Sequence, residues 1–435
     1  MMDRLSHLIK SKFAKDGLWL IGSQLILSVC ALLINIFISQ KYSSEGFGVF
    51  SISFKVYLIT SVLASFSTNV IALRYISQFN AEKEREEKCL STAFTMALFF
   101  SLLIMIIGIL LCFFITKLVD EEILQYCLMV FFIGIPFFVL NKFYFNVLNG
   151  LRKMQLFAFL QALRWLLLAA GVITFSTFFS FSLWKMCLVF PVTECILFMV
   201  AALAVKPYFK TKLTWKKGWI TEHFHFGWQS VFSYAITEIH NYSDVFVLGI
   251  FTNVSTVGLY SFAADIAKNL FAFTDILQTN FNPIIAELWW KKKHEELNSK
   301  IKQLRNFTYL LYAPICLFSV FAYSVLIRYF LNDSGYTESY YPFIILCLGV
   351  FLFSGIRPSM AILELCGFQK LKLKINLVAL FINILLNGLL AYFYGIKGIA
   401  LATVFSYIVY SLLLDFTVQK KIKITLLTGW QYQAY

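Results

Sequence analysis

Ionisable side chains in the middle of long apolar segments are the residues of this sequence that could do chemistry. Four of them are basic, namely Lys55, Arg164, Lys268 and Arg357. A cation inside a membrane is costly unless it meets an anion, and arginine holds a phosphate group with two parallel hydrogen bonds. A cavity lined by these four cations would therefore suit a diphosphate. The alternative is that the two arginines only form structural ion pairs with Glu194 or Asp275.

A second set of ionisable residues within the apolar segments could couple transport to an ion. Its members are carboxylates and one imidazole: Glu194, Glu238, His240, Asp244, Asp265 and Asp275. Glu238, Asn241 and Asp244 follow one another at three-residue spacing, close to one helical face. A carboxylate in a low-dielectric setting can carry a proton, and a nearby histidine can relay it. We therefore predict coupling to protons or sodium ions, and a hydrogen-bonded polar seam between helices is the alternative.

The elements that must position these groups are membrane spans. The chain has 435 residues, of which 60% are hydrophobic and only 14% are charged. A soluble domain carries about 25% charged residues, and a single core stops growing at roughly 250–300 residues. The composition therefore excludes an ordinary soluble protein and, because disorder needs low hydrophobicity, a disordered chain. It predicts an integral membrane protein with many spans.

We predict an all-α fold with twelve transmembrane helices, since a span needs about 20 apolar residues. The segments that satisfy this requirement are 18–40, 46–70, 91–116, 123–147, 156–178, 182–204, 225–250, 256–281, 307–331, 341–365, 373–393 and 398–419. Most lysines and arginines outside these segments fall on the side that holds both termini. The positive-inside rule therefore places the N- and C-termini in the cytoplasm.

An internal repeat predicts two homologous halves. The sequence Gly-Val-Phe-Ser at 48–51 recurs as Gly-Leu-Tyr-Ser at 258–261, and 150–153 resembles 367–370 at nearly the same offset. Six spans per half is an even number, so both halves enter the membrane in the same direction. We expect two six-helix bundles related by a parallel pseudo-two-fold axis, with a central cavity. The predicted parts are a cytoplasmic amphipathic segment, an N-terminal half, a basic cytoplasmic linker, a C-terminal half and a basic cytoplasmic tail, at 1–17, 18–204, 205–224, 225–419 and 420–435.

The repeat also relates individual charges. The offset of the first repeat places Lys55 opposite Asp265, so equivalent positions of the two halves carry opposite charges. Asp265 and Lys268 are three residues apart and share a helical face. We expect the three side chains to line the gap between the halves and to exchange partners during transport. Crosslinking of Lys55→Cys to Asp265→Cys would test this hypothesis.

Several classes of function are not expected. The net charge of +14 is explained by basic cytoplasmic loops rather than by binding of nucleic acid. The nine cysteines have no C-x-x-C spacing, and His223 and His225 lack a third ligand, so we expect no metal and no cofactor. There is no G-x-x-x-x-G-K-[ST] loop for a nucleotide. The long outer loop or paired catalytic residues of a membrane polymerase or acyltransferase are also missing, so we predict a transporter rather than an enzyme.

Several segments resemble the polysaccharide transporter family. The stretches 42–51 and 257–261 are similar to the entry of that family's second span and its repeat, and 244–249 to the end of its seventh span. The stretch 373–407 looks like its last two spans. The family is that of the Wzx-type flippases for O-antigen and capsule repeat units, in the MOP superfamily with the MATE exporters. The chain departs from the pattern at Ser43-Ser44, where Gly-Pro is common, and it lacks a proline before Tyr394.

This resemblance implies a substrate, a membrane and a set of partners. The substrate would be an undecaprenyl-diphosphate-linked oligosaccharide, moved by alternating access from the cytoplasmic to the outer leaflet of a bacterial inner membrane. Membrane lipids, a polysaccharide polymerase and a chain-length regulator would be the partners. The family supplies no catalytic motif, so the site residues above, apart from Asp244, rest on depth and charge. The alternative is a cation-coupled multidrug exporter of the MATE kind, whose mostly cationic substrates would not require four deep basic residues.

Overall fold

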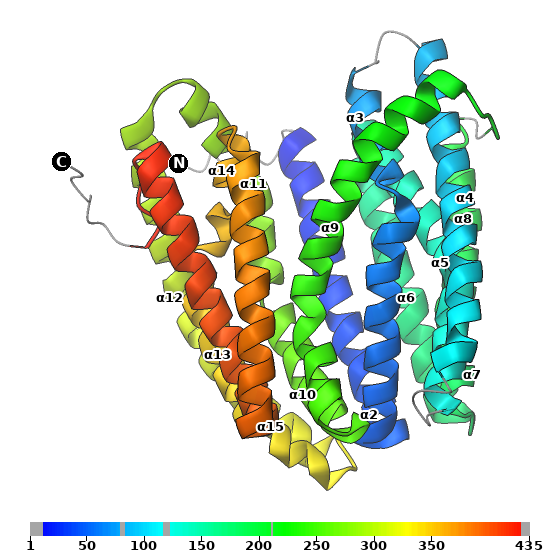
Figure 1. Cartoon of the computed structure of the whole chain (residues 1–435), viewed down its shortest axis with the longest axis vertical. Helices are drawn as coiled ribbons and strands as arrows, with labels where there is room; N and C mark the ends of the chain where they lie inside the picture. The colour runs from blue at the N-terminus through cyan, green and yellow to red at the C-terminus, as the bar shows by residue number, and fades with distance from the viewer. Residues whose placement is uncertain (1–11, 79–82, 116–121, 210–211, 428–435) are drawn as a thin grey trace. The chain divides into compact units, whose positions relative to one another are not determined.

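The computed structural model describes residues 12–78, 83–115, 122–209 and 212–427, and every regular element in these ranges is helical (Figure 1). The elements are α2 (Lys12–Ser65), α3 (Thr68–Gln78), α4 (Lys83–Ile115), α5 (Glu122–Gly150), α6 (Met154–Phe178), α7 (Leu183–Cys187), α8 (Val189–Val205), α9 (Lys217–Phe251), α10 (Val254–Asn269), α11 (Ala272–Trp290), α12 (His294–Tyr329), η1 (Ser334–Ser339), α13 (Tyr340–Ser354), η2 (Arg357–Ser359), α14 (Ile362–Leu365) and α15 (Gln369–Ile422). The predicted all-α class is confirmed. The expected amphipathic segment at the N-terminus falls mainly on residues 1–11, outside the described ranges.

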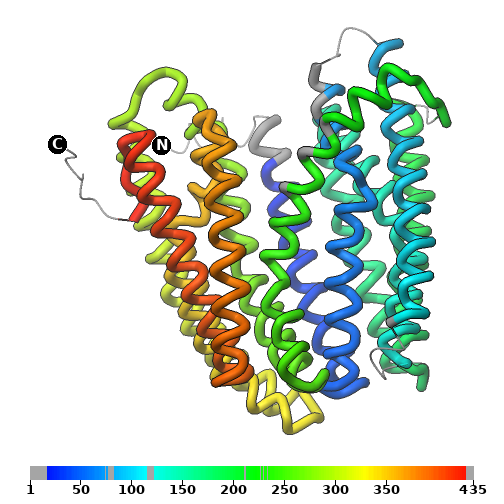
Figure 2. The backbone as a smooth tube through the Cα atoms, viewed as in Figure 1, coloured from blue at the N-terminus to red at the C-terminus, as the bar shows by residue number. Residues whose placement is uncertain are grey.

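The long apolar helices are consistent with twelve crossings of a membrane. Within the described ranges, eight helices are long and apolar enough to cross one. Two of the eight, α2 and α15, contain a residue with non-helical backbone angles, Ser43 and Gly395, where the chain turns back on itself (Figure 2). Each of these helices therefore supplies two crossings, which makes ten. The more polar α9 and the broken pair α10–α11 cover the two predicted spans that remain.

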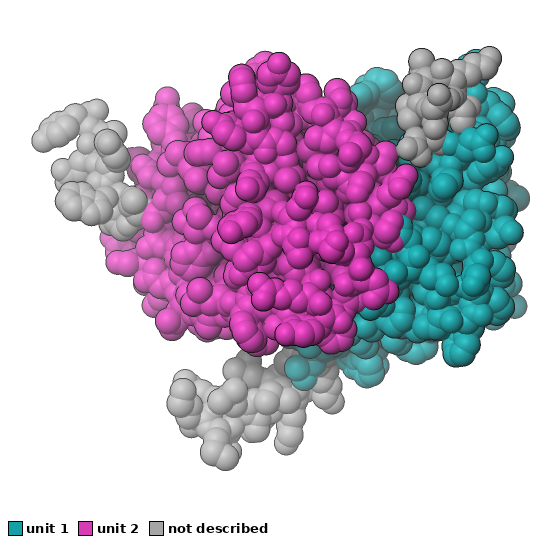
Figure 3. Space-filling model, turned by 90° about the horizontal axis from the view of Figure 1, so that it is seen from below, with its two compact units in different colours: residues 1–42, 49–238 teal, residues 43–48, 239–435 magenta. Residues whose placement is uncertain are grey.

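Two compact units make up the chain (Figure 3). Unit 1 comprises residues 1–42 and 49–238, and unit 2 comprises residues 43–48 and 239–435. The boundary lies inside α9, and the turn in the middle of α2 belongs to unit 2. The duplication inferred from the repeat, and the halves placed at 18–204 and 225–419, stay predictions.

Helix α5 is the centre of unit 1. It packs against α3, α4 and α8, and most of its residues are buried, including Pro136 in its middle. Aromatic rings fill the contact between α5, α8 and the part of α2 that follows its turn at Ser43. The centroids of Phe50, Phe54, Phe131 and Phe190 lie 5.2–6.1 Å apart in every pairing. Such offset ring pairs add to the stabilisation that apolar packing supplies.

Helix α13 has the same place in unit 2, where it packs against α10, α12 and α15. It ends at Ser354 and is followed by the short 3-10 turn η2. Pro358 lies in this turn and has no N–H group, so it cannot donate the hydrogen bond of a regular α-helix, which favours a break here. The break places Arg357 next to α11, which contacts η2.

The turn of α2 is tied to other elements of unit 2 by hydrogen bonds. The backbone N–H of Ser44 donates to Oδ2 of Asp333 at 3.0 Å, and its hydroxyl lies 2.7 Å from that of Ser255. The N–H of Gly335 donates to the other carboxylate oxygen of Asp333 at 2.8 Å. Partial burial raises the pKa of Asp333, but the hydrogen bonds from Ser44 and Gly335 outweigh it and hold this pKa below its ordinary value. The ionised carboxylate therefore stabilises the turn.

Two glycines of the internal repeat lie at the closest approach of this turn to α10. A Cβ atom on Gly258 would lie 1.9 Å from the carbonyl oxygen of Ser44, and one on Gly48 would lie 2.1 Å from that of Val254. Real Cβ atoms do not approach a backbone oxygen so closely, and backbone cannot move aside as a flexible side chain can. The repeat therefore has a packing reason at both positions, because only glycine leaves room for the two backbones.

We expect Gly258→Ala to destabilise the protein by about 1–3 kcal/mol, because the added methyl group overpacks the contact with Ser44. Thermal unfolding of the purified protein in detergent measures the effect. Gly388→Ala is the matched control, since a Cβ at Gly388 meets nothing within 4 Å and alanine favours the helix. Equal unfolding temperatures for the two variants would contradict the close packing of the turn.

Candidate functional site

Unit 1 contains a polar cavity of about 490 Å³ among the spanning helices. Three ionisable side chains line it: Lys142 from α5, Arg164 from α6 and Glu238 from α9. The other lining residues are mainly amides, hydroxyls and aromatic rings: Ser65, Ser67, Asn69, Phe145, Asn146, Asn149, Phe157, Gln161 and Tyr234, with Val62, Val70 and Leu73. A polar cavity within apolar helices can hold a polar or charged ligand away from lipid.

Arg164 forms an ion pair with Glu194 of α8. Its Nη2 atom lies 2.8 Å from Oε2 of Glu194, and the two side chains are 12% and 4% exposed. The amide of Asn141 donates to the same carboxylate oxygen at 2.8 Å and to the backbone oxygen of Glu194 at 2.9 Å. The guanidinium group also lies over the ring of Phe138, 4.7 Å from its centroid. The contact that the structural alternative required for Arg164 is therefore present.

A second cavity, of about 190 Å³, lies within unit 2. It collects four of the predicted coupling and binding residues, namely His240 and Asp244 of α9, Lys268 of α10 and Arg357 of η2. The remaining lining residues are Asn241, Tyr242, Phe271, Asn383, Thr403 and Tyr407. His240 and Asp244 thus line the same cavity, and their role in ion coupling stays a prediction.

Asp244 accepts hydrogen bonds from two other side chains at this cavity. Its Oδ2 atom accepts from the hydroxyl of Tyr260 at 2.8 Å and from Nζ of Lys268 at 3.0 Å. Lys268 also donates to the backbone oxygen of Asn241 at 2.7 Å. Asp244 is only 3% exposed, so its charge depends on these donors for compensation. In this arrangement the ammonium group of Lys268 is the direct counter-ion of Asp244.

Arg357 is held by two hydrogen bonds to Asp275. Its Nε donates to Oδ1 at 2.7 Å and its Nη2 to Oδ2 at 3.1 Å, which is the bidentate arrangement typical of arginine and carboxylate. Asp275 lies in the first turn of α11, where the helix dipole favours a negative charge. The guanidinium group lies 4.2 Å from the ring centroid of Phe271. Both arginines of the predicted site therefore have a carboxylate partner.

The four predicted cations are distributed over the two units. Arg164 lines the cavity of unit 1, and Lys268 and Arg357 line that of unit 2. Lys55 is 2% exposed and donates to the hydroxyl of Ser51, one turn earlier on α2. Asp265 is half-buried on α10. A cavity shared by all four cations, and exchange of partners among Lys55, Asp265 and Lys268, stay predictions.

The site contains residues that our sequence analysis missed. Lys142 lies near the end of a predicted span and did not stand out, although Asn146 and Asn149 follow it on the same helical face. Tyr260 and Thr403 contact each other beside Asp244, with 3.2 Å between their oxygens. Their residue types are common in apolar helices, so no signal in the sequence separated them from ordinary buried residues.

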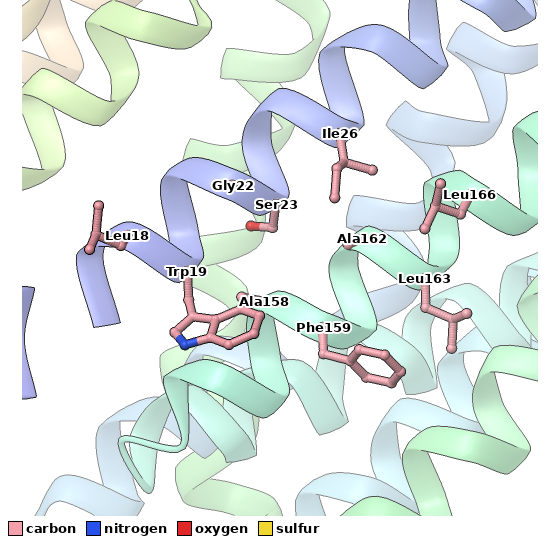
Figure 4. A pocket seen from close by; sticks show the side chains of 10 residues that line it. All are labelled: Leu18, Trp19, Gly22, Ser23, Ile26, Ala158, Phe159, Ala162, Leu163 and Leu166. Carbon is pink, nitrogen blue, oxygen red and sulfur yellow. The ribbon is translucent and has the colours of Figure 1, made fainter. Parts of the chain in front are cut away.

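An apolar groove of about 430 Å³ runs between α2 and α6 in unit 1 (Figure 4). Apart from Ser23, its lining is apolar: Leu18, Trp19, Gly22, Ile26, Ala158, Phe159, Ala162, Leu163 and Leu166. Such a lining matches hydrocarbon chains, which fits a protein that lies among membrane lipids. No group of three or more His, Cys, Asp or Glu within the described ranges is placed to hold a metal ion.

Two family models match this chain. The family model described as "Polysaccharide biosynthesis protein" matches residues 13–289, and the model named MatE matches residues 230–389. The chain is 21% identical over 426 residues to the uncharacterised membrane protein MJ1068 of Methanocaldococcus jannaschii. This match covers 92% of this chain and 82% of that protein.

Solved structures share the fold. A structure of the lipid II flippase MurJ in an inward closed conformation superposes with a TM-score of 0.74 at 17% identity, over 92% of this chain and 87% of MurJ. An inward-facing multidrug resistance MATE family transporter of the MOP superfamily gives a TM-score of 0.75 at 12% identity, over 94% of this chain and 98% of that transporter. The predicted MATE-like fold is therefore confirmed. Because the first family model spans more than half of the chain, this protein belongs to the polysaccharide biosynthesis protein family, and its long apolar helices make it a multi-pass membrane protein.

Proposed function

We propose that the protein is a flippase for undecaprenyl-diphosphate-linked oligosaccharide repeat units. It moves them from the cytoplasmic to the outer leaflet of the bacterial inner membrane, for biosynthesis of O-antigen or capsular polysaccharide. Both termini lie in the cytoplasm, and the two halves work by alternating access. The polyprenyl tail stays in lipid while the head group passes through the protein. A polymerase and a chain-length regulator act on the repeat units after transport.

The observation that carries this proposal is the cavity of unit 1. It lies among helices that cross a membrane, yet cations, a carboxylate and several amides line it. Burial of such groups is unfavourable unless a polar ligand or water meets them. A diphosphate with attached sugars has the matching chemistry, because it offers anionic oxygens to the cations and hydroxyls to the amides.

Ion coupling belongs to the cavity of unit 2 in this proposal. Asp244 and His240 would carry a proton or hold a sodium ion, with Lys268 as the competing counter-ion of Asp244. Glu194 and Asp275 hold the two arginines in place. Glu238 and Asp265 complete the set of carboxylates that could respond to ion binding.

Deletion of the gene in its native host tests the proposed function. We expect complete undecaprenyl-linked repeat units to accumulate and the surface polysaccharide to disappear, because assembled units remain on the cytoplasmic side. Mass spectrometry of extracted lipids gives the first quantity, and immunoblotting of surface glycan gives the second. Unchanged lipids and surface glycan, in a strain without a second transporter of this family, would instead favour a cation-coupled drug exporter.

A further inference from the structure

Three side-chain amides in the cavity of unit 1 have no hydrogen-bond partner among the described residues. They are Asn69 of α3, Asn149 of α5 and Gln161 of α6, and each is half-buried. A side-chain amide offers two donors and one acceptor oxygen, and here these groups are available to a ligand in the cavity. Amides from three separate helices thus point to a ligand that is rich in donors and acceptors.

Lys142 is the cation of this cavity that makes no ion pair with any described residue. Its ammonium group lies 3.3 Å from the hydroxyl of Ser61 and 4.3 Å from the ring centroid of Phe138. Arg164, by contrast, already holds Glu194 at 2.8 Å. Glu238 lines the same cavity, and its carboxylate adds an acceptor for hydroxyl groups. Lys142 is therefore the cation best placed to meet an incoming anion.

We propose that this cavity is the head-group site of unit 1, with Lys142 bound to the diphosphate and the three amides bound to the sugar next to it. The assignment rests on the proposed function and makes it more specific. A sugar diphosphate combines two negative oxygens with neighbouring hydroxyl groups, and the cavity combines one available ammonium group with amides and a carboxylate. The site distinguishes sugars by hydrogen bonds, because an amide without a partner rejects a ligand that cannot satisfy it.

Binding to the purified full-length protein in detergent tests whether Lys142 binds the diphosphate. The probe is farnesyl-diphosphate-linked N-acetylglucosamine, and farnesol is the uncharged reference. We expect Lys142→Gln to weaken binding of the probe by about tenfold or more and to leave farnesol binding unchanged, since only the probe offers phosphate oxygens. Lys142→Arg should retain most of the affinity. The matched control Lys185→Gln removes an exposed lysine of the same unit and should bind as the wild type does.

A second variant tests whether the amides bind the sugar. Asn149→Leu keeps a similar side-chain volume but loses the amide. It should weaken binding of the sugar-linked probe by several-fold and leave farnesyl diphosphate, which has no sugar, unaffected. If thermal unfolding shows that Lys142→Gln does not fold, Asn149→Leu still tests the proposal independently.

Three results would overturn the proposal. The first is wild-type affinity for the probe in both Lys142→Gln and Asn149→Leu. The second is equal weakening of the probe and farnesol, which would indicate a structural effect. The third is equal or tighter binding of UDP-N-acetylglucosamine, which would assign the cavity to a nucleotide sugar rather than to a lipid. If Lys142-dependent binding is found but gene deletion leaves the lipid intermediates unchanged, the site stands and the flippase function fails.

Discussion

Replacement of Glu194 by leucine should destabilise the folded protein by about 3–5 kcal/mol, one of the largest effects expected in this chain. Glu194 is 3% exposed and accepts hydrogen bonds from Arg164 and Asn141. Its removal leaves a buried guanidinium group without a counter-ion. Thermal unfolding in detergent measures the loss. Glu287→Leu is the control, because the pair of Glu287 with Lys291 is well exposed and its loss should change little.

A double variant separates the two roles that remain open for Arg164. Arg164→Met combined with Glu194→Leu replaces the buried ion pair by apolar side chains of similar volume, and such replacements often restore stability. If Arg164 also binds the diphosphate, the double variant should be stable but should not restore surface polysaccharide in a deletion strain. Normal polysaccharide in cells that carry the stable double variant would show that Arg164 has only a structural role.

Replacement of Asp244 by asparagine should reduce transport by about 10- to 100-fold while the protein still folds. Asparagine keeps the size of the side chain but removes the charge that Lys268 and the hydroxyl of Tyr260 contact. Loss of a hydrogen bond to a charged group costs about 1.5–3 kcal/mol, which corresponds to that range in rate. Transport into proteoliposomes, with and without an imposed proton or sodium gradient, measures the change.

The gradient is the informative part of this experiment. If Asp244 couples an ion to transport, a gradient should stimulate the wild type and have no effect on Asp244→Asn. Glu364→Gln is the matched control in unit 2, since it also neutralises a carboxylate paired with a lysine, Lys372 at 2.9 Å, but outside the cavity. Retention of the response to the gradient by Asp244→Asn would remove this residue from the coupling mechanism.

Composition and local pattern were sufficient to predict the class of the protein and most of its helical segments, but the segments predicted as single spans at 46–70, 256–281 and 341–365 are each interrupted in the structure. Apolar segments of about 20 residues are a property of the chain itself, and the membrane requires their backbone to form helices. The break at Gly395 falls between two predicted spans, and the break at Ser43 likewise falls between the first two. The glycines at 48 and 258 were recognised as a repeat, and the structure supplies the reason, which is close contact of two backbones.

The cost of a buried charge also made it possible to predict from the sequence that the ionisable residues within the spans would need partners. Which partners they have was decided only by tertiary structure. Arg164 pairs with Glu194 across 30 residues of sequence, Arg357 with Asp275 across 82, and Lys268 with Asp244 across 24. No helical spacing relates these positions. Likewise, the proposed role of Lys142 could not be predicted from the sequence around it. Only the packing of the helices shows that amides of α3 and α6 line the same cavity as Lys142. The sequence by itself thus determined that charges lie inside a membrane bundle, whereas the packing of helices distant in the chain decided which charges are neutralised and which remain available to a ligand.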